Sequence, residues 1–138
     1  MKKPTRSAIS LALLAVVAFV AVSACDLFTT PVTIKNRLDN FVAELNKADR
    51  SSVYLQLDSS ATSYSAAKAA SFWDALFAKE TYSITDIVDS NPEAVTAKLT
   101  GNGTFGTQTI TFGMSKTGTV NLIYTIKSIN FGGKTVFN

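Results

Sequence analysis

The sequence predicts an α+β fold, in which N-terminal helices pack on a curved four-stranded antiparallel meander. Two observations support this class. Apolar residues recur at helical spacing between about residues 31 and 79, and threonine and β-branched residues become frequent from residue 82 onward. Because the helices precede the strands instead of alternating with them, neighbouring strands are expected to pair directly. Each strand has one apolar face, which the first helix is expected to cover.

Three helices are expected ahead of the sheet. The first covers residues 31–48, with Thr30 as its N-cap and Pro31 at its first position. A short second helix covers residues 51–57, and a third covers residues 66–79 after a Ser/Thr-rich loop. Helical spacing predicts the inward-facing residues Ile34, Leu38, Phe41, Val42, Leu45, Val53, Tyr54, Leu57, Ala69, Phe72, Trp73, Leu76 and Phe77.

The first two strands lie on either side of a turn at Asn91-Pro92. Residues 82–88 form the first strand. Residues 95–105 are expected to form a long second strand, because its apolar parity runs unbroken through two glycines. The following hairpin then falls at Gly106-Thr107, and the alternative places it at Gly101-Asn102-Gly103.

Two further strands complete the expected sheet. Residues 109–114 form the third strand, and the fourth covers residues 120–131. The apolar alternation of the fourth strand changes phase near Lys127-Ser128, which predicts a β-bulge there. Gly132-Gly133 ends this strand, and residues 134–138 leave room for a short edge.

Residues 1–24 have the three parts of a secretory signal peptide. A positively charged start is followed by an apolar stretch and then by small residues. The stretch Val22-Ser23-Ala24-Cys25 resembles the lipobox of bacterial lipoproteins, and Cys25 is the only cysteine of the chain. This resemblance implies cleavage after Ala24, acylation of Cys25 and anchoring of the exported chain through membrane lipid, in the cell membrane or the outer membrane.

The expected organisation after cleavage is simple. Residues 25–29 comprise the lipidated cysteine and a short tether, and residues 30–138 form a single α+β domain. Five extended residues reach about 17 Å, so the domain is expected to lie close to the bilayer. Leu27 and Phe28 either enter the membrane interface or pack on the domain, and both alternatives stay open.

Composition limits the chemistry of the mature chain. Three of the 13 basic residues precede Cys25, so the mature chain has ten basic and ten acidic residues. With no net positive charge on its side chains, it is not expected to bind nucleic acid. Histidine is absent, and lipid is expected to occupy the only thiol. The commonest general base and the usual ligands of transition metals are therefore missing, and we expect no metal and no cofactor.

The predicted domain resembles the cystatin-like, or NTF2-like, architecture of some small bacterial lipoproteins. The resemblance covers residues 30–131 and implies a curved sheet wrapped on the first helix. Proteins of this fold include hydratases and isomerases as well as non-catalytic binding and assembly modules, so the fold does not select a function. Besides the element order, the residues that carry the resemblance are Phe41, Leu45, Asp49, Tyr54, Leu55, Phe72 and Trp73.

Five aromatic residues are candidates for a ligand site. They either line a pocket for a small apolar ligand or fill a small core, and both interpretations fit the sequence. These residues are Phe72, Trp73, Phe77, Tyr82 and Tyr124.

Asp86 is the candidate for chemistry. Enzymes of the resembled fold place an Asp–His or a Tyr–Asp pair at the mouth of the fold, and only the second type can exist here. Asp86 alternates with Ile84 and Val88, which turns it inward towards the tyrosines; alternatively Ile87 faces the core and Asp86 is solvated.

Together these observations predict an exported, membrane-anchored and non-catalytic module of the cell envelope. It is expected to bind an envelope protein or a small apolar ligand. One alternative is a small enzyme that uses Asp86 and tyrosines, and another is a passive envelope or surface-antigen protein that has no pocket.

Overall fold

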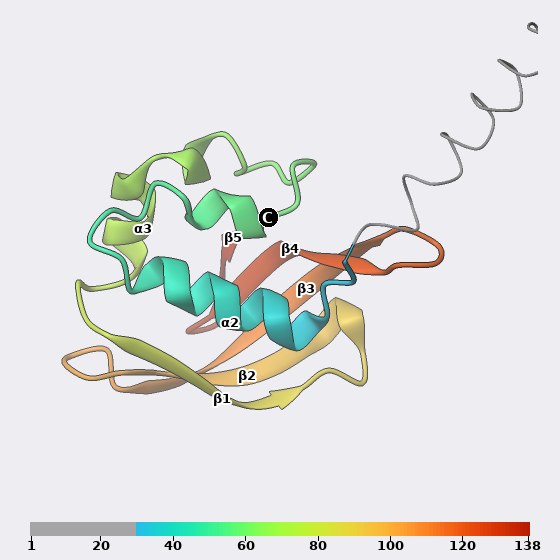
Figure 1. The fold of residues 1–138 in the computed structure, drawn as a ribbon. Coiled ribbons are helices and arrows are strands. Elements are labelled where there is room, and N and C mark those ends of the chain that lie inside the picture. The colour runs from blue at the N-terminus through green and yellow to red at the C-terminus, as the bar shows by residue number, and fades with distance from the viewer. Residues whose placement is uncertain (1–29) are drawn as a thin grey trace, which may run out of the picture.

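The computed structural model describes residues 30–138, so the expected signal peptide, the cleavage site at Ala24, the lipidated Cys25 and the tether lie outside the described residues. Within residues 30–138, two α-helices, α2 (Ile34–Leu45) and α3 (Ala70–Leu76), accompany a five-stranded antiparallel sheet (Figure 1). The class is therefore α+β, as predicted. The strands are β1 (Tyr82–Val88), β2 (Val95–Gly101), β3 (Thr107–Thr117), β4 (Ile123–Phe131) and β5 (Lys134–Phe137).

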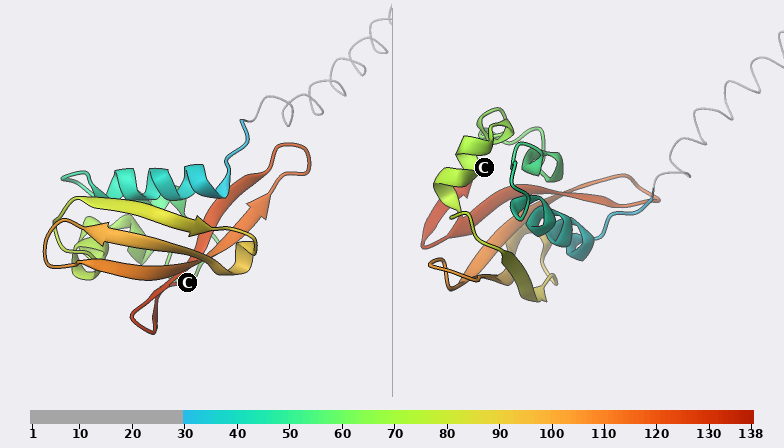
Figure 2. Two further views of the ribbon diagram at one scale, coloured as in Figure 1. Left: turned by 90° about the horizontal axis from the view of Figure 1, so that it is seen from below. Right: turned by 60° about the vertical axis from the view of Figure 1, so that its left-hand side comes forward.

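Each strand pairs with the next one along the chain, in the order β1-β2-β3-β4-β5. The prediction of four strands was one short, because residues after Gly132-Gly133 return along β4 and form β5. Both glycines have positive φ, 60° and 74°, which is the backbone that a two-residue hairpin turn requires. Figure 2 shows α2 lying along one face of this sheet.

Helix α2 is shorter at both ends than predicted. Thr33, rather than Thr30, is the N-cap, and its Oγ1 accepts a hydrogen bond from the Asn36 N–H at 3.1 Å. The preceding Val32 is extended, because its N–H donates to the carbonyl of Leu122 and its carbonyl accepts from the N–H of Tyr124. A helix from Pro31 would remove these bonds to the sheet.

The expected second and third helices form in shorter pieces. The former is a 3₁₀ turn, η1 (Val53–Gln56), and the latter divides into η2 (Ala66–Lys68) and α3. Ala69 between them is extended and exposed, while Ala67 is buried. The reason is tertiary, since the indole Nε1 of Trp73 donates to the Ala67 carbonyl at 2.7 Å and holds that turn inward.

Strand β2 ends at Gly101, so the prediction of a long strand to Phe105 was wrong. The alternative hairpin at Gly101-Asn102-Gly103 was closer to the observed loop, which covers residues 102–106. The loop that follows is held from outside the hairpin. The carboxylate of Glu80 accepts the N–H groups of Gly103 and Thr104 at 3.0 and 2.6 Å, and that of Phe105 at 3.1 Å. These three donors are therefore turned away from a strand ladder, and the pairing stops.

The bulge expected near Lys127-Ser128 is confirmed. Gly113 pairs with Ser128 and Met114 pairs with Ile126, which leaves Lys127 as the extra residue of β4. Strand β4 itself begins at Ile123, so Val120 and Leu122 belong to the turn before it.

The first half of β4 has no neighbouring strand on its outer side. Single bridges to Val32 and Leu57 cover this edge, and β5 pairs with the second half of β4. This arrangement removes most of an exposed sheet edge, which would otherwise be a site for aggregation.

Candidate functional site

The aromatic residues expected to line a pocket fill the core instead. Trp73 and Phe77 are fully buried and Tyr82 is 3% exposed. Phe41 of α2 contacts the edges of Trp73 and Phe112, with ring centroids 5.7 and 5.9 Å apart. This packing takes up the space between the helices and the sheet with edge-to-face aromatic contacts.

The remaining candidates are separated from one another. Phe72 is half-buried and packs on Trp73 with centroids 5.0 Å apart, and Tyr124 is half-buried near the start of the described chain. Asp86 is exposed and forms an ion pair with Lys98 of β2, at 2.8 Å. That hydrogen bond raises the pKa of Lys98 above its ordinary value.

The outward position of Asp86 follows from a bulge in β1. The pairing of β1 with β2 shifts between Thr85 and Val88, and Asp86 itself has a φ of 52°. The extra residue breaks the alternation with Ile84, so Ile87 packs against the core and Asp86 faces solvent. The inward Asp86 with neighbouring tyrosines is therefore not the arrangement found.

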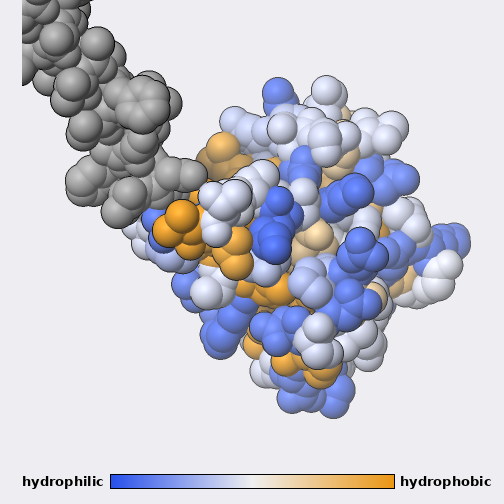
Figure 3. All heavy atoms as spheres, turned by 90° about the vertical axis from the view of Figure 1, so that its right-hand side faces the viewer, coloured by the Kyte–Doolittle hydropathy of each residue, from blue (hydrophilic) through white to orange (hydrophobic). Residues whose placement is uncertain are grey.

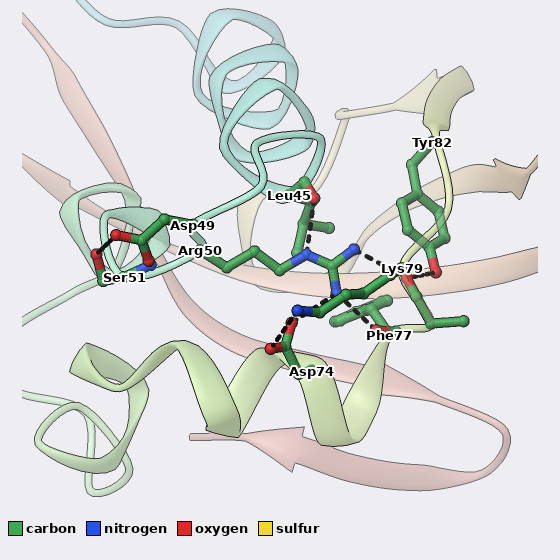
Figure 4. Close-up of polar contacts among 9 residues, drawn as sticks. Leu45, Asp49, Arg50, Ser51, Asp74, Phe77, Lys79 and Tyr82 are labelled. Atoms are coloured by element: carbon green, nitrogen blue, oxygen red, sulfur yellow. Dashed lines mark hydrogen bonds and ion pairs between the residues drawn. The ribbon is translucent and has the colours of Figure 1, made fainter.

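Arg50 is one of two buried polar residues among residues 30–138, with Gln56, and the sequence alone did not single it out. The residue is 2% exposed, and each of its three guanidinium nitrogens donates a hydrogen bond (Figure 4). Nε donates to the Leu45 carbonyl at 2.8 Å, Nη1 donates to the Phe77 carbonyl at 2.6 Å, and Nη2 donates to the Ala78 carbonyl at 2.8 Å.

These bonds make Arg50 a structural residue. The accepting carbonyls lie at the ends of α2 and α3, where helices leave carbonyls without intrahelical partners. Asp74 balances part of the charge at 3.3 Å and also pairs with Lys79. The local sequence Asp49-Arg50-Ser51 forms a turn in which Asp49 accepts the Ser51 N–H, but nothing local signals that the arginine is buried.

A polar hollow opens where the bulge of β4 meets the loop after η1, and we call it the bulge hollow. It encloses about 450 Å³. Lys127 and Glu93 bring opposite charges to it, and hydroxyl groups supply donors and acceptors. Its lining consists of Ser60, Ala61, Thr62, Glu93, Gly113, Met114, Lys127, Ser128 and Asn138.

Backbone contacts give the bulge hollow a defined wall. The N–H of Asp58 donates to the Ile126 carbonyl at 2.8 Å, which ties the loop to β4. The Asp58 carboxylate then accepts the hydroxyl and the N–H of Ser60 at 2.7 and 2.8 Å. The Ser60 hydroxyl bond, with another from Ser115, lowers the pKa of Asp58 and keeps this side chain charged.

Gly113 lines the bulge hollow. A Cβ added there would collide with Oγ of Ser128, which lies opposite it on β4. Any side chain at this position would therefore require Ser128 to move. The sequence signal for this region was the change of parity at Lys127-Ser128, which predicted the bulge but not the hollow beside it.

A second hollow lies at the end of the domain where the described chain begins, and we call it the end hollow. It encloses about 470 Å³ and is lined mainly by apolar surface. Tyr124 is the one predicted ligand residue that lines it. The lining consists of Pro31, Thr33, Ile34, Asp89, Ser90, Pro92, Val120, Leu122 and Tyr124.

Residues 30–138 lack two other features that would point to a function. No group of three or more acidic, cysteine or histidine side chains is placed to hold a metal ion. None of the helices described is both long and apolar enough to cross a membrane. Comparison of the chain with protein-family models, with curated proteins and with solved structures found no match.

Proposed function

We propose that this chain is an exported lipoprotein whose folded domain acts as a non-catalytic binding module at the surface of a membrane. The anchoring part rests on the sequence Val22-Ser23-Ala24-Cys25 behind an apolar stretch. It is supported by the placement of Thr30–Val32, which enters the fold at one end of the sheet rather than through its middle (Figure 1). A short tether at that end leaves the remaining faces of the domain accessible.

The binding part rests on one observation, namely that the interior is filled and the bulge hollow is open. An apolar ligand has no space among Phe41, Trp73 and Phe77, whose rings contact one another. A polar partner, by contrast, would meet Lys127, Glu93 and several hydroxyl groups in one depression. We therefore infer that the partner is a polar segment of an envelope protein, bound by hydrogen bonds and by both charges.

The proposed kinship with NTF2-like or cystatin-like domains is supported by the same architecture. One long helix, α2, lies along an antiparallel sheet whose strands follow one another in sequence. In such domains the binding function depends on side chains and not on the fold.

Site-specific crosslinking in intact membranes tests the binding proposal. A photoreactive amino acid replaces Thr62 in the bulge hollow or, as the matched control, Thr109 on β3 outside it; both residues are exposed threonines. We expect a discrete crosslinked product from position 62 and none from position 109. Equal products at both positions, or none at either, would contradict a partner at this hollow and favour a passive envelope protein.

Metabolic labelling tests the anchoring proposal separately. The wild-type chain is expected to incorporate labelled palmitate. The Cys25→Ala variant is expected to incorporate none, since the sequence contains no other thiol. Labelling that persists in Cys25→Ala would exclude Cys25 as the lipid site.

A further inference from the structure

We propose that the end hollow and the β3–β4 turn beside it form a membrane-contacting surface, which rests on the bilayer that carries the lipid anchor. This inference rests on the proposed lipidation of Cys25. It adds an orientation of the domain and a set of residues that touch lipid.

The first argument is the exposure of large hydrophobic residues. Within residues 30–138, only three are strongly exposed: Val120 at 70%, Leu55 at 57% and Val88 at 56%. Val120 lines the end hollow, and Val88 directly precedes Asp89, which lines it too. Figure 3 views this end of the molecule and shows hydrophobic residues gathered on it. An exposed apolar side chain beside a hollow that is lined mainly by apolar surface indicates a contact surface.

The second argument is the place where the chain enters the domain. Val32 bonds to the backbone of Leu122 and Tyr124, so the start of the described chain lies against the base of the β3–β4 turn. The proposed lipid site at Cys25 precedes Thr30 by five residues, which span at most about 17 Å. Lipid is therefore the apolar phase that this end of the domain meets at high effective concentration.

The third argument is the chemistry of the surface. Tyr124, with an apolar ring and a polar tip, is a side chain suited to the boundary between lipid and water. The hollow contains an acidic residue, Asp89, and no basic residue lines it. The contact is thus apolar rather than electrostatic, and we expect it to depend little on salt or on anionic headgroups.

Depth-dependent quenching in vesicles tests this orientation with the full lipidated protein. Since lipid occupies Cys25, a single dye-reactive thiol can be introduced by Val120→Cys, Leu55→Cys or Ala48→Cys. Leu55→Cys is the chemically matched control, because Leu55 is an exposed apolar residue that does not line the end hollow. Ala48→Cys is the positional control, because Ala48 is exposed and follows the opposite end of α2.

The labelled proteins are reconstituted into vesicles of phosphatidylethanolamine and phosphatidylglycerol that contain lipids with a quencher on the acyl chain. We expect the dye at position 120 to be quenched severalfold more than the dyes at positions 55 and 48, with the same ratio at low and high salt. Equal quenching at all three positions would overturn the proposed orientation. A dye at position 120 shielded from both lipid and aqueous quenchers would overturn it as well, since another part of the chain or another protein would then cover the surface.

Flotation of the same samples separates this inference from the one on which it depends. If the wild-type protein floats with the vesicles and the Cys25→Ala variant does not, anchoring holds and quenching decides the orientation. If the wild-type protein fails to float, the lipoprotein proposal itself is wrong, and the orientation is wrong with it.

Discussion

The guanidinium of Arg50 lies against the end of α3, where Nη1 donates to the carbonyl oxygen of Phe77 over 2.6 Å. The same side chain reaches Leu45 at the end of α2 and Ala78 beyond α3. One residue therefore joins the ends of both helices and donates to two buried carbonyl groups and to a partly buried third. Carbonyls left without donors in a protein interior are costly, which makes Arg50 a sensitive position.

We expect Arg50→Lys to lower the free energy of unfolding by about 3 kcal/mol, because an ammonium group cannot reach three divergent carbonyls at once. Urea unfolding can be followed by the fluorescence of Trp73, the only tryptophan. Lys35→Met is the control, since Lys35 pairs with Asp39 on the surface and should change stability by less than about 1 kcal/mol. Similar losses in the two variants would show that the hydrogen bonds of Arg50 to the ends of α2 and α3 do not stabilise the fold.

The hydrogen bonds of Glu80 predict how the stability of the fold depends on pH. Desolvation raises the pKa of its carboxyl, but hydrogen bonds from Thr104, Phe105 and Gly103 outweigh this effect and hold the pKa below its ordinary value of 4.5. A lowered pKa in the folded state means that the stabilisation is present above the ordinary pKa and is lost as the pH falls through the folded-state pKa.

The corresponding experiment compares thermal unfolding of the wild type and Glu80→Gln. The variant should unfold a few degrees lower at neutral pH, and the difference should shrink as the pH falls below 4.5. Thr109→Ala, a change at an exposed residue of β3 that carries no titratable group, should show no such trend. A difference between wild type and Glu80→Gln that stays constant with pH would contradict the assignment.

Gly113 and Ser128 should be coupled. Gly113→Ala places a methyl group against Oγ of Ser128 and is expected to lower the free energy of unfolding by about 1–3 kcal/mol. In the double variant with Ser128→Ala that oxygen is gone, and most of the loss should be recovered. A double-mutant cycle in urea measures the coupling. Strictly additive effects would mean that the added methyl group at position 113 does not meet the Ser128 side chain.

At position 86, the free energy of unfolding should depend on backbone conformation more than on the charge of the side chain. Its ion pair with Lys98 is exposed, so Asp86→Asn should change the free energy of unfolding by less than about 1 kcal/mol. Asp86→Val places a β-branched residue at a φ of 52° and should cost about 1–2 kcal/mol. Circular dichroism during thermal unfolding can compare them. An enzymatic activity lost in Asp86→Asn, with folding intact, would instead favour the enzyme alternative.

Local patterns predicted those elements whose cause is local. The limits of β1 were predicted correctly, the apolar stripe of α2 is buried as expected, and the change of parity at Lys127 revealed the bulge in β4. In each case the side chains of one segment alternate between the core and solvent with the period of that segment. The resulting α+β class was therefore accessible from the sequence.

The elements predicted wrongly are those decided by distant partners. Pro31 and Val32 look like the start of a helix, but the backbone of β4 pairs with Val32 and keeps it extended. Strand β2 is shorter than predicted because Glu80 holds the loop that follows it. The burial of Arg50 depends on carbonyls 27 and 28 residues away in the chain.

For the candidate sites, the same division applies. The sequence by itself determined the residue types, the absence of histidine and the position of the only cysteine behind an apolar stretch, and the lipobox and membrane anchoring inferred from this position stay predictions. Only the tertiary structure decided that Trp73, Phe77 and Tyr82 fill the core, that Asp86 faces solvent, and that hollows open beside Lys127 and Val120. The physical reason is that periodicity shows which side of a segment is apolar, whereas the space left between segments depends on how all of them pack.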